Sequence, residues 1–122
     1  MPLVIVTRDP NTMNDAQALK LGPDLATIVA EALNAPNDEG GALTAKDIEV
    51  RFRDIGPLDL NASPLEIEVF ANDYPSRKAN LEDRVDRICR ELRIHPSVPT
   101  CAIDDKGGFV WVFLGAAAFG LL

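Results

Sequence analysis

A repeated order of strand, turn and helix most strongly limits the folds open to this chain. An apolar run at 4–6 leads through Pro10 to an amphipathic segment, and a second run at 67–71 leads through Pro75 to another. Each half then continues to a further strand-like segment. Two β-α-β units with right-handed crossovers form one four-stranded sheet that carries both helices on the same face. The sequence therefore predicts an α+β sandwich of two layers.

Hydrophobic periodicity places the elements of this sandwich. Period-two alternation and spacing of three to four residues distinguish strands from helices. We predict helices at 15–33 and 81–93, and four strands of a mixed sheet at 3–8, 47–53, 65–71 and 99–103. The run 109–113 follows the turn-like stretch 104–108, which predicts one more strand in a C-terminal hairpin.

Alternation in the second strand also predicts which side chains face away from the helices. Ile48, Val50 and Phe52 are expected to point toward the helices. The opposite sheet face would then carry charges of both signs, namely Glu49, Arg51, Arg53, Glu66 and Glu68. Such a face suits cross-strand ion pairs or a polar contact between subunits.

Size and charge limit the class of protein. The chain has 122 residues, of which 47% are hydrophobic, so a single domain over 1–122 can bury its own core. A formal net charge of −7 repels a phosphate backbone, and we expect no nucleic-acid partner. Cys89 and Cys101 show no disulfide or metal-binding spacing, which favours a reducing, cytoplasmic location.

The C-terminal stretch 109–122 is the most apolar part of the sequence. It is shorter than the roughly 20 residues that a membrane-spanning helix needs, so we expect no membrane insertion. Surplus apolar surface at 114–122 predicts self-association, although the tail folding back on its own core is the alternative.

Pro2, directly ahead of the first strand, is the candidate catalytic residue. If Met1 is removed, Pro2 becomes a free secondary amine; α-amino groups titrate near about 8, and burial lowers that pKa. A neutral amine held by a sheet meets the requirements of a general base. A retained Met1 would make Pro2 a tertiary amide without basicity. Proline is also structurally easy at the first position of a strand.

Met1-Pro2 at the head of a strand, two β-α-β units and the helix-ending segment 92–96 (Leu-Arg-Ile-His-Pro) together resemble the tautomerase superfamily. That last segment is most similar to the macrophage migration inhibitory factor branch. The resemblance implies a homotrimer with sites at subunit interfaces and no cofactor. It also implies an N-terminal proline that shuttles a proton in keto-enol isomerisation. In relatives, this proline assists hydration, dehalogenation or decarboxylation.

Such chemistry needs cations for a developing enolate and a substrate carboxylate. The resemblance makes Arg51 and Arg77 the first candidates, because relatives carry arginines on the second strand and after the third. Arg8 and Lys46 are further candidates. The alternative for each of these cations is that it is only a surface charge or an ion-pair partner. Trp111 and Phe113 are candidates for an apolar pocket wall, with core packing as the alternative.

The sequence also departs from the family pattern. The predicted strand 99–103 lacks the aromatic hydroxyl and the amide that line the pocket in the migration inhibitory factor branch. His95, the only histidine, is expected to cap the second helix, and we predict no metal site. Three interpretations remain: a tautomerase-type enzyme acting on a small keto/enol or unsaturated carboxylic acid, a catalytically inactive binding or assembly protein of that fold, and an unrelated α+β domain.

Overall fold

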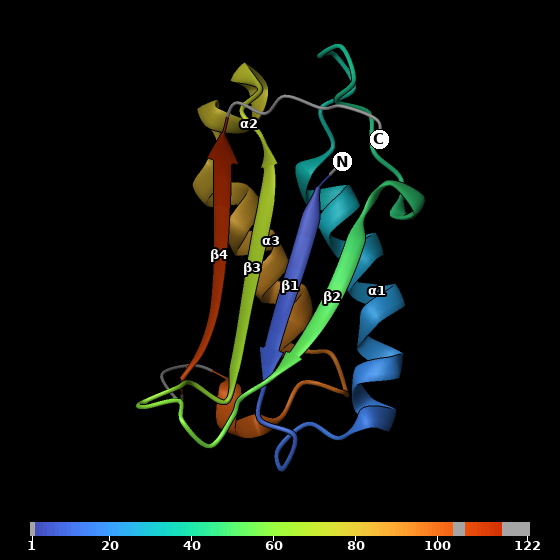
Figure 1. The fold of residues 1–122 in the computed structure, drawn as a ribbon. Helices are drawn as coiled ribbons and strands as arrows, with labels where there is room; N and C mark the ends of the chain where they lie inside the picture. The colour runs from blue at the N-terminus through green and yellow to red at the C-terminus, as the bar shows by residue number, and fades with distance from the viewer. Residues whose placement is uncertain (1, 104–106, 116–122) are drawn as a thin grey trace, which may run out of the picture.

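The computed structural model describes residues 2–103 and 107–115 (Figure 1). The strands are β1 (Leu3–Arg8), β2 (Glu49–Asp54), β3 (Leu65–Asn72) and β4 (Gly108–Gly115). The α-helices are α1 (Asp15–Leu33), α2 (Pro75–Ala79) and α3 (Leu81–Arg93), and the short 3-10 helices are η1 (Ala45–Asp47) and η2 (Thr100–Ala102). No helix in the described ranges is long and apolar enough to cross a membrane.

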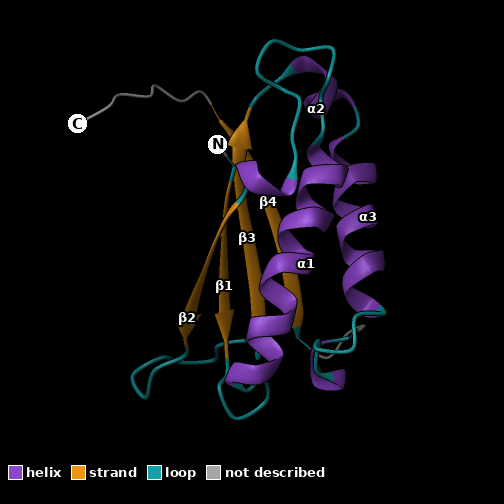
Figure 2. Cartoon of the chain, turned by 90° about the vertical axis from the view of Figure 1, so that its right-hand side faces the viewer, coloured by secondary structure: helices purple, strands orange, loops and turns teal. Residues whose placement is uncertain are grey.

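The four strands form one mixed sheet in the order β2-β1-β3-β4. β1 pairs with β2 in parallel, β3 pairs with β4 in parallel, and β1 and β3 are antiparallel. Two β-α-β units therefore meet through their first strands. Figure 2 shows α1 and α3 together on one face of the sheet, which confirms the predicted two-layer α+β architecture.

Apolar stripes on the helices explain this packing. Asn14 and Gln17 form a capping box that starts α1, and Leu21, Leu25, Val29 and Leu33 on its inner face are fully buried. Across the layer, the sheet contributes the fully buried Val4, Val6 and Val69. Burying side chains of this size stabilises the fold by about 1.5–3 kcal/mol each.

The predicted strand at 99–103 and the C-terminal hairpin are wrong, whereas the predicted strand at 109–113 is confirmed as part of β4. Residues 99–103 contain the 3-10 helix η2, closed by hydrogen bonds from Ala102 N to Pro99 O and from Ile103 N to Thr100 O. The fourth strand is β4, which runs parallel to β3 and so is reached by a crossover rather than a hairpin. Its β-branched and aromatic residues suit a strand better than the turn-forming 99–103 does. Residues 104–106 of the expected turn and 116–122 of the expected self-association segment lie outside the described residues.

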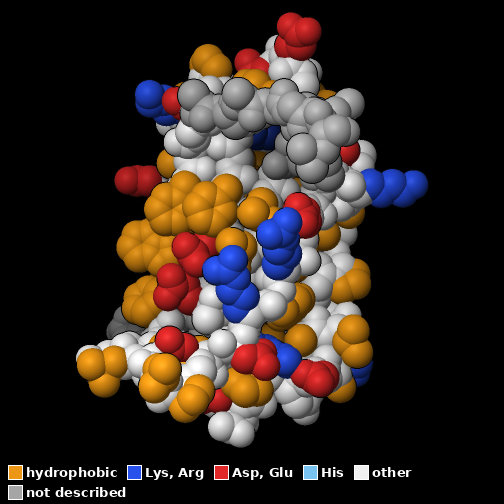
Figure 3. Space-filling model, viewed as in Figure 1, with side chains coloured by type: hydrophobic (Ala, Val, Ile, Leu, Met, Phe, Trp, Pro, Cys, Tyr) orange, Lys and Arg blue, Asp and Glu red, His pale blue; other side chains and the backbone are white. Residues whose placement is uncertain are grey.

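The sheet face away from the helices is polar at the β2 edge and aromatic at the β4 edge (Figure 3). Glu49, Arg51 and Arg53 point outward from β2, as predicted. β1 separates β2 from β3, so Arg51 pairs with Glu49 at 2.8 Å instead of with the glutamates of β3. The other side carries four partly exposed rings, here called the aromatic stripe: Phe70, Phe109, Trp111 and Phe113.

Rings of the aromatic stripe stack on one another. The ring centroids of Phe70 and Phe113 lie 5.2 Å apart, and those of Trp111 and Phe113 lie 6.1 Å apart. Trp111 and Phe113 are 51% and 44% exposed, so they are not packed in the core. A patch of this kind on a small domain is typical of a contact surface.

Candidate functional site

Strand register places Pro2 between two segments that are distant in sequence. Leu3 lies opposite Glu49 on β2 and opposite Phe70 on β3. The carbonyl oxygen of Pro2 accepts a hydrogen bond of 3.1 Å from Glu49 N. Asp47, ahead of β2, and Asn72, at the end of β3, therefore come close to the buried Pro2.

A cavity of about 110 Å³ lies beside Pro2. Its lining residues include four with polar side chains of different chemical kinds: a carboxylate, an amide, a phenol and a guanidinium. Besides Pro2, the lining residues are Gly40, Ala42, Leu43, Asp47, Asn72, Tyr74 and Arg77. The cavity is large enough for a small organic molecule or several waters. We call it the Pro2 cavity.

Arg77 is the cation of the Pro2 cavity, and only 1% of it is exposed. Its Nε donates to the carbonyl oxygen of Leu33 at 2.8 Å, and its Nη1 donates to that of Asn72 at 3.1 Å. The guanidinium carbon lies 4.7 Å from the ring centroid of Tyr74. Burial lowers the pKa of Arg77 below its usual value, and the charge of Arg84 adds to this effect. An arginine still carries its charge at neutral pH.

Arg77 also belongs to a set of arginines that satisfy the carboxyl-terminal carbonyls of α1. Arg84 Nη1 donates to Ala32 O at 3.1 Å, and Arg87 Nη1 donates to Glu31 O at 3.5 Å. The last turn of α1 has no basic residue of its own. These cations therefore compensate both the unpaired carbonyls and the negative end of the helix dipole.

The loop between α1 and η1 forms the outer wall of the Pro2 cavity. Ala35 N donates to Gly41 O at 2.8 Å, and Gly41 N donates to Asp38 O at 2.9 Å, which closes a tight turn. A Cβ on Gly41 would lie 2.3 Å from the carbonyl oxygen of Ala35, so the turn admits only glycine there. Ser76 Oγ donates to the Asp38 carboxylate and fastens the loop to α2.

Arg8 was predicted as a site residue, but it lies at the other end of β1 from Pro2. It is 7% exposed and donates to Asp54 Oδ1 at 3.0 Å and to Met13 O at 3.0 Å. The hydrogen bond that Arg8 Nη2 donates to the Asp15 carboxylate is the main cause that raises the pKa of Arg8. Arg8 therefore ties the end of β1 to β2 and to the start of α1, and takes no part in the Pro2 cavity.

The remaining predicted residues lie elsewhere in the chain's fold. Lys46 precedes the lining residue Asp47 on η1, but its own side chain is exposed. Arg51 lies on the outer sheet face beside Glu49. Trp111 and Phe113 belong to the aromatic stripe and line no part of the Pro2 cavity. Of the predicted set, the structure brings together Pro2 and Arg77.

Sequence reasoning did not single out Asp47, Asn72 or Tyr74 as lining residues. Asn72 and Tyr74 stand just before Pro75 in the repeated strand-turn-helix order, which is a signal that could have identified them. Asp47 and the loop 40–43 carry no local signal, because their contact with Pro2 arises only when the loop folds over the end of β1.

His95 does not use its side chain to cap α3. Its Nδ1 accepts a hydrogen bond of 3.1 Å from Ser97 N, and its Nε2 lies 2.7 Å from Asp24 Oδ2 on α1. His95 therefore ties the segment after α3 to α1. Within residues 2–103 and 107–115, no group of three or more His, Cys, Asp or Glu side chains is arranged to hold a metal ion.

Comparison with known proteins finds similarity to solved structures. No family model matches the chain, and no curated protein matches it in sequence. The structure is similar to that of a fused 4-OT asymmetric trimer (TM-score 0.62, 14% identity, covering 98% of this chain and 91% of the other). It is also similar to malonate semialdehyde decarboxylase (TM-score 0.60, 15% identity, 98% and 91%).

A third similar structure is the macrophage migration inhibitory factor-like protein of Entamoeba histolytica, with a TM-score of 0.58 and 12% identity over 93% of this chain and 88% of the other. At such identities the likeness concerns the fold. The similarity covers 93–98% of this chain, whose described residues form two β-α-β units in one four-stranded mixed sheet. The fold of this protein is therefore tautomerase-like, in that it is shared with the 4-OT, malonate semialdehyde decarboxylase and Entamoeba histolytica structures.

Proposed function

We propose that this protein is a tautomerase-like enzyme that uses Pro2, freed by removal of Met1, as a general base. Its substrate would be a small keto, enol or unsaturated carboxylic acid. One observation carries the proposal: Pro2 and the buried Arg77 line the same cavity of about 110 Å³. The similar structures of 4-OT and malonate semialdehyde decarboxylase support it at the level of the fold.

Pro2 has the surroundings that a basic amine needs. It is buried at the start of β1, and its carbonyl oxygen is fixed by Glu49 N. Burial disfavours the ammonium form, which keeps the secondary amine neutral near pH 7. In keto-enol isomerisation this nitrogen takes a proton from the carbon next to the carbonyl group. The resulting prolinium then returns the proton to the enolate oxygen.

Arg77 supplies the positive charge for the substrate carboxylate. Two of its nitrogens are used by the carbonyls of Leu33 and Asn72, which hold the guanidinium in one orientation. Among the described residues, Nη2 has no hydrogen-bond partner, so it is the atom assigned to the substrate. A charge-assisted hydrogen bond in a site that excludes water is stronger than the same bond in solvent.

We further propose that the protein assembles as a homotrimer in the cytoplasm. The aromatic stripe leaves stacked, half-exposed rings on the outer sheet face, where another subunit would cover them. One similar structure is described as an asymmetric trimer. In such an assembly Arg51, which points away from its own Pro2 cavity, would be available to a neighbouring subunit.

A catalytically inactive protein of the same fold is the second candidate. Two hydrogen bonds of Arg77 favour this candidate. Its Nε and Nη1 both donate to main-chain carbonyl oxygens, so the residue has a structural role even without a ligand. Retention of Met1 would also make the protein inactive, since the lone pair of an acylated Pro2 nitrogen is delocalised into the carbonyl group and does not take up a proton.

The decisive experiment compares the processed protein with Pro2→Ala. Intact-mass measurement first shows whether Met1 is absent, and turnover of phenylpyruvate and 2-hydroxymuconate is then assayed. We expect a loss of about 10²- to 10⁴-fold in kcat/KM for Pro2→Ala. Pro10→Ala, an exposed turn proline, is the matched control and should keep full activity. Unchanged turnover in Pro2→Ala would remove Pro2 from the mechanism, and absence of turnover in the processed wild type favours the inactive protein.

A further inference from the structure

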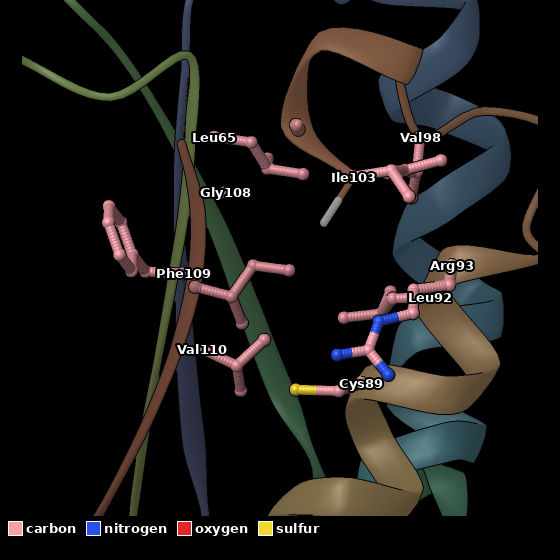
Figure 4. Close-up of a pocket in the computed structure, with 11 residues that line it drawn as sticks. Leu65, Cys89, Leu92, Arg93, Val98, Ile103, Gly108, Phe109 and Val110 are labelled. Atoms are coloured by element: carbon pink, nitrogen blue, oxygen red, sulfur yellow. The ribbon is translucent and has the colours of Figure 1, made fainter. Parts of the chain in front are cut away.

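A second cavity, of about 70 Å³, lies between α3 and β4. Figure 4 shows side chains from both elements converging on it. It is bounded at the sheet by Leu65 and Gly108, the first residues of β3 and β4. Pro2 lies near Asn72 at the other end of β3, about 20 Å away at the usual rise per strand residue. We call this second space the α3–β4 cavity.

The walls of the α3–β4 cavity are mainly apolar. Ile67, Leu92 and Val98 are buried around it, and Val110 is half-buried. A single water needs only about 10–15 Å³ of such space, so the cavity has room for several, and its walls offer them few polar partners. An apolar body of a few carbon atoms would fill it with better contacts than water makes.

In the part of the chain that the structure describes, Arg93 is the one cation that lines this cavity. Figure 4 shows the Arg93 guanidinium and the Cys89 sulfur directed from α3 toward the cavity, one helical turn apart. Among the described residues, Arg93 forms no hydrogen bond or ion pair, unlike Arg84 and Arg87 on the same helix. Its donors are therefore open to a ligand from the cavity.

Cys89 behaves as part of the apolar wall. Burial raises the pKa of its thiol, and this outweighs the opposing effect of the Arg93 charge. The thiol is consequently neutral at physiological pH, and a neutral Cys packs like a small hydrophobic side chain.

We propose that the α3–β4 cavity is a second ligand site, which binds a short carboxylic acid with a branched or aromatic body. The apolar part contacts Leu65, Leu92 and Val110, and the carboxylate accepts hydrogen bonds from Arg93. This site is independent of the chemistry at Pro2, because it shares no lining residue with the Pro2 cavity.

The test uses Cys89 as a local reporter in the full-length Cys101→Ser protein. Alkylation of Cys89 by iodoacetamide is followed by mass spectrometry with benzoate, with its neutral isostere benzamide, or with neither. We expect benzoate to slow alkylation at concentrations about fivefold lower than benzamide, the upper end of what one ion pair at the exposed Arg93 supplies. Because the readout is at Cys89, binding of benzoate in the Pro2 cavity does not imitate it.

Two arginine variants decide the role of the guanidinium. Arg93→Gln should remove the preference for benzoate over benzamide, whereas Arg90→Gln, an exposed neighbour that does not line the cavity, should keep it. For each variant, we take the ratio of the benzamide and benzoate concentrations that slow alkylation equally. The ratio is needed because Arg93 also affects the thiol pKa and therefore the absolute rate of alkylation. Equal effects of benzoate and benzamide on the parent protein, or a preference that survives Arg93→Gln, would overturn the proposal. So would unchanged alkylation at saturating benzoate.

Discussion

Arg77 Nε donates a 2.8 Å hydrogen bond to the carbonyl oxygen of Leu33, the last residue of α1. The same residue lines the Pro2 cavity. One side chain therefore connects the end of a helix in the first β-α-β unit with the candidate site, and the position of the cation follows from how α1 ends.

Arg77→Lys is expected to lower the free energy of unfolding by about 2–3 kcal/mol, because an ammonium cannot reproduce two directed hydrogen bonds and leaves buried carbonyls unpaired. Arg87→Lys is the control, since the Arg87 side chain is 48% exposed and its pairing contributes little. Urea denaturation measures both. A loss below about 1 kcal/mol for Arg77→Lys would contradict the structural role.

The stability of the protein should depend on the ionisation of Cys89. Burial raises its pKa above the ordinary value of 9.0, so the folded protein keeps the thiol proton at pH values where the unfolded chain has lost it. This contribution is complete below pH 9.0 and falls as the pH rises through and above that value. Urea denaturation from pH 7 to 10.5 should show a steeper decline for the wild type than for Cys89→Ala. Equal slopes would mean that the thiol ionises as freely in the fold as in the unfolded chain.

The two glycines that bound β4 should respond differently to alanine. A Cβ on Gly108 would lie 2.2 Å from the carbonyl oxygen of Ala102, whereas one on Gly115 meets no atom of the described residues within 4 Å. Gly108→Ala is expected to cost about 2 kcal/mol through backbone displacement, and Gly115→Ala is expected to be nearly neutral. Thermal unfolding of the two variants measures this difference. Similar melting temperatures for Gly108→Ala and Gly115→Ala would be inconsistent with the close approach of η2 to β4.

Charge placed in the aromatic stripe should disrupt assembly. Trp111→Lys puts an ammonium among the rings of Phe70 and Phe113, and we expect the sedimentation coefficient to fall to that of a monomer. Leu19→Lys changes an apolar residue on α1 that is 76% exposed and outside the stripe, and it should leave assembly unchanged. If the wild type itself sediments as a monomer, the proposed homotrimer is wrong.

The order of helices and strands could be predicted from the sequence because it depends on local patterns of apolar residues. The apolar stripe of α3 predicted the bounds 81–93 that the structure has, and alternation in β2 predicted that Arg51 points outward. Pro2 was identified because its chemistry follows from its place in the sequence. The fourth strand was misplaced, since 99–103 is short and apolar, and such segments form a strand or a 3-10 turn according to what they pack against.

Local pattern thus determined the two β-α-β units, the layered architecture and the candidate base. Only the tertiary structure decided which cation meets that base. Arg8, Arg51 and Arg77 are chemically alike, but the fold places them differently. Arg8 is paired with acidic residues at the far end of β1, and Arg51 faces outward beside Glu49. Arg77 is held beside the loop 34–44 by its hydrogen bond to the carbonyl oxygen of Leu33. Side-chain charge is a property of the residue, whereas its distance from another residue is set by strand pairing and helix packing over the whole chain.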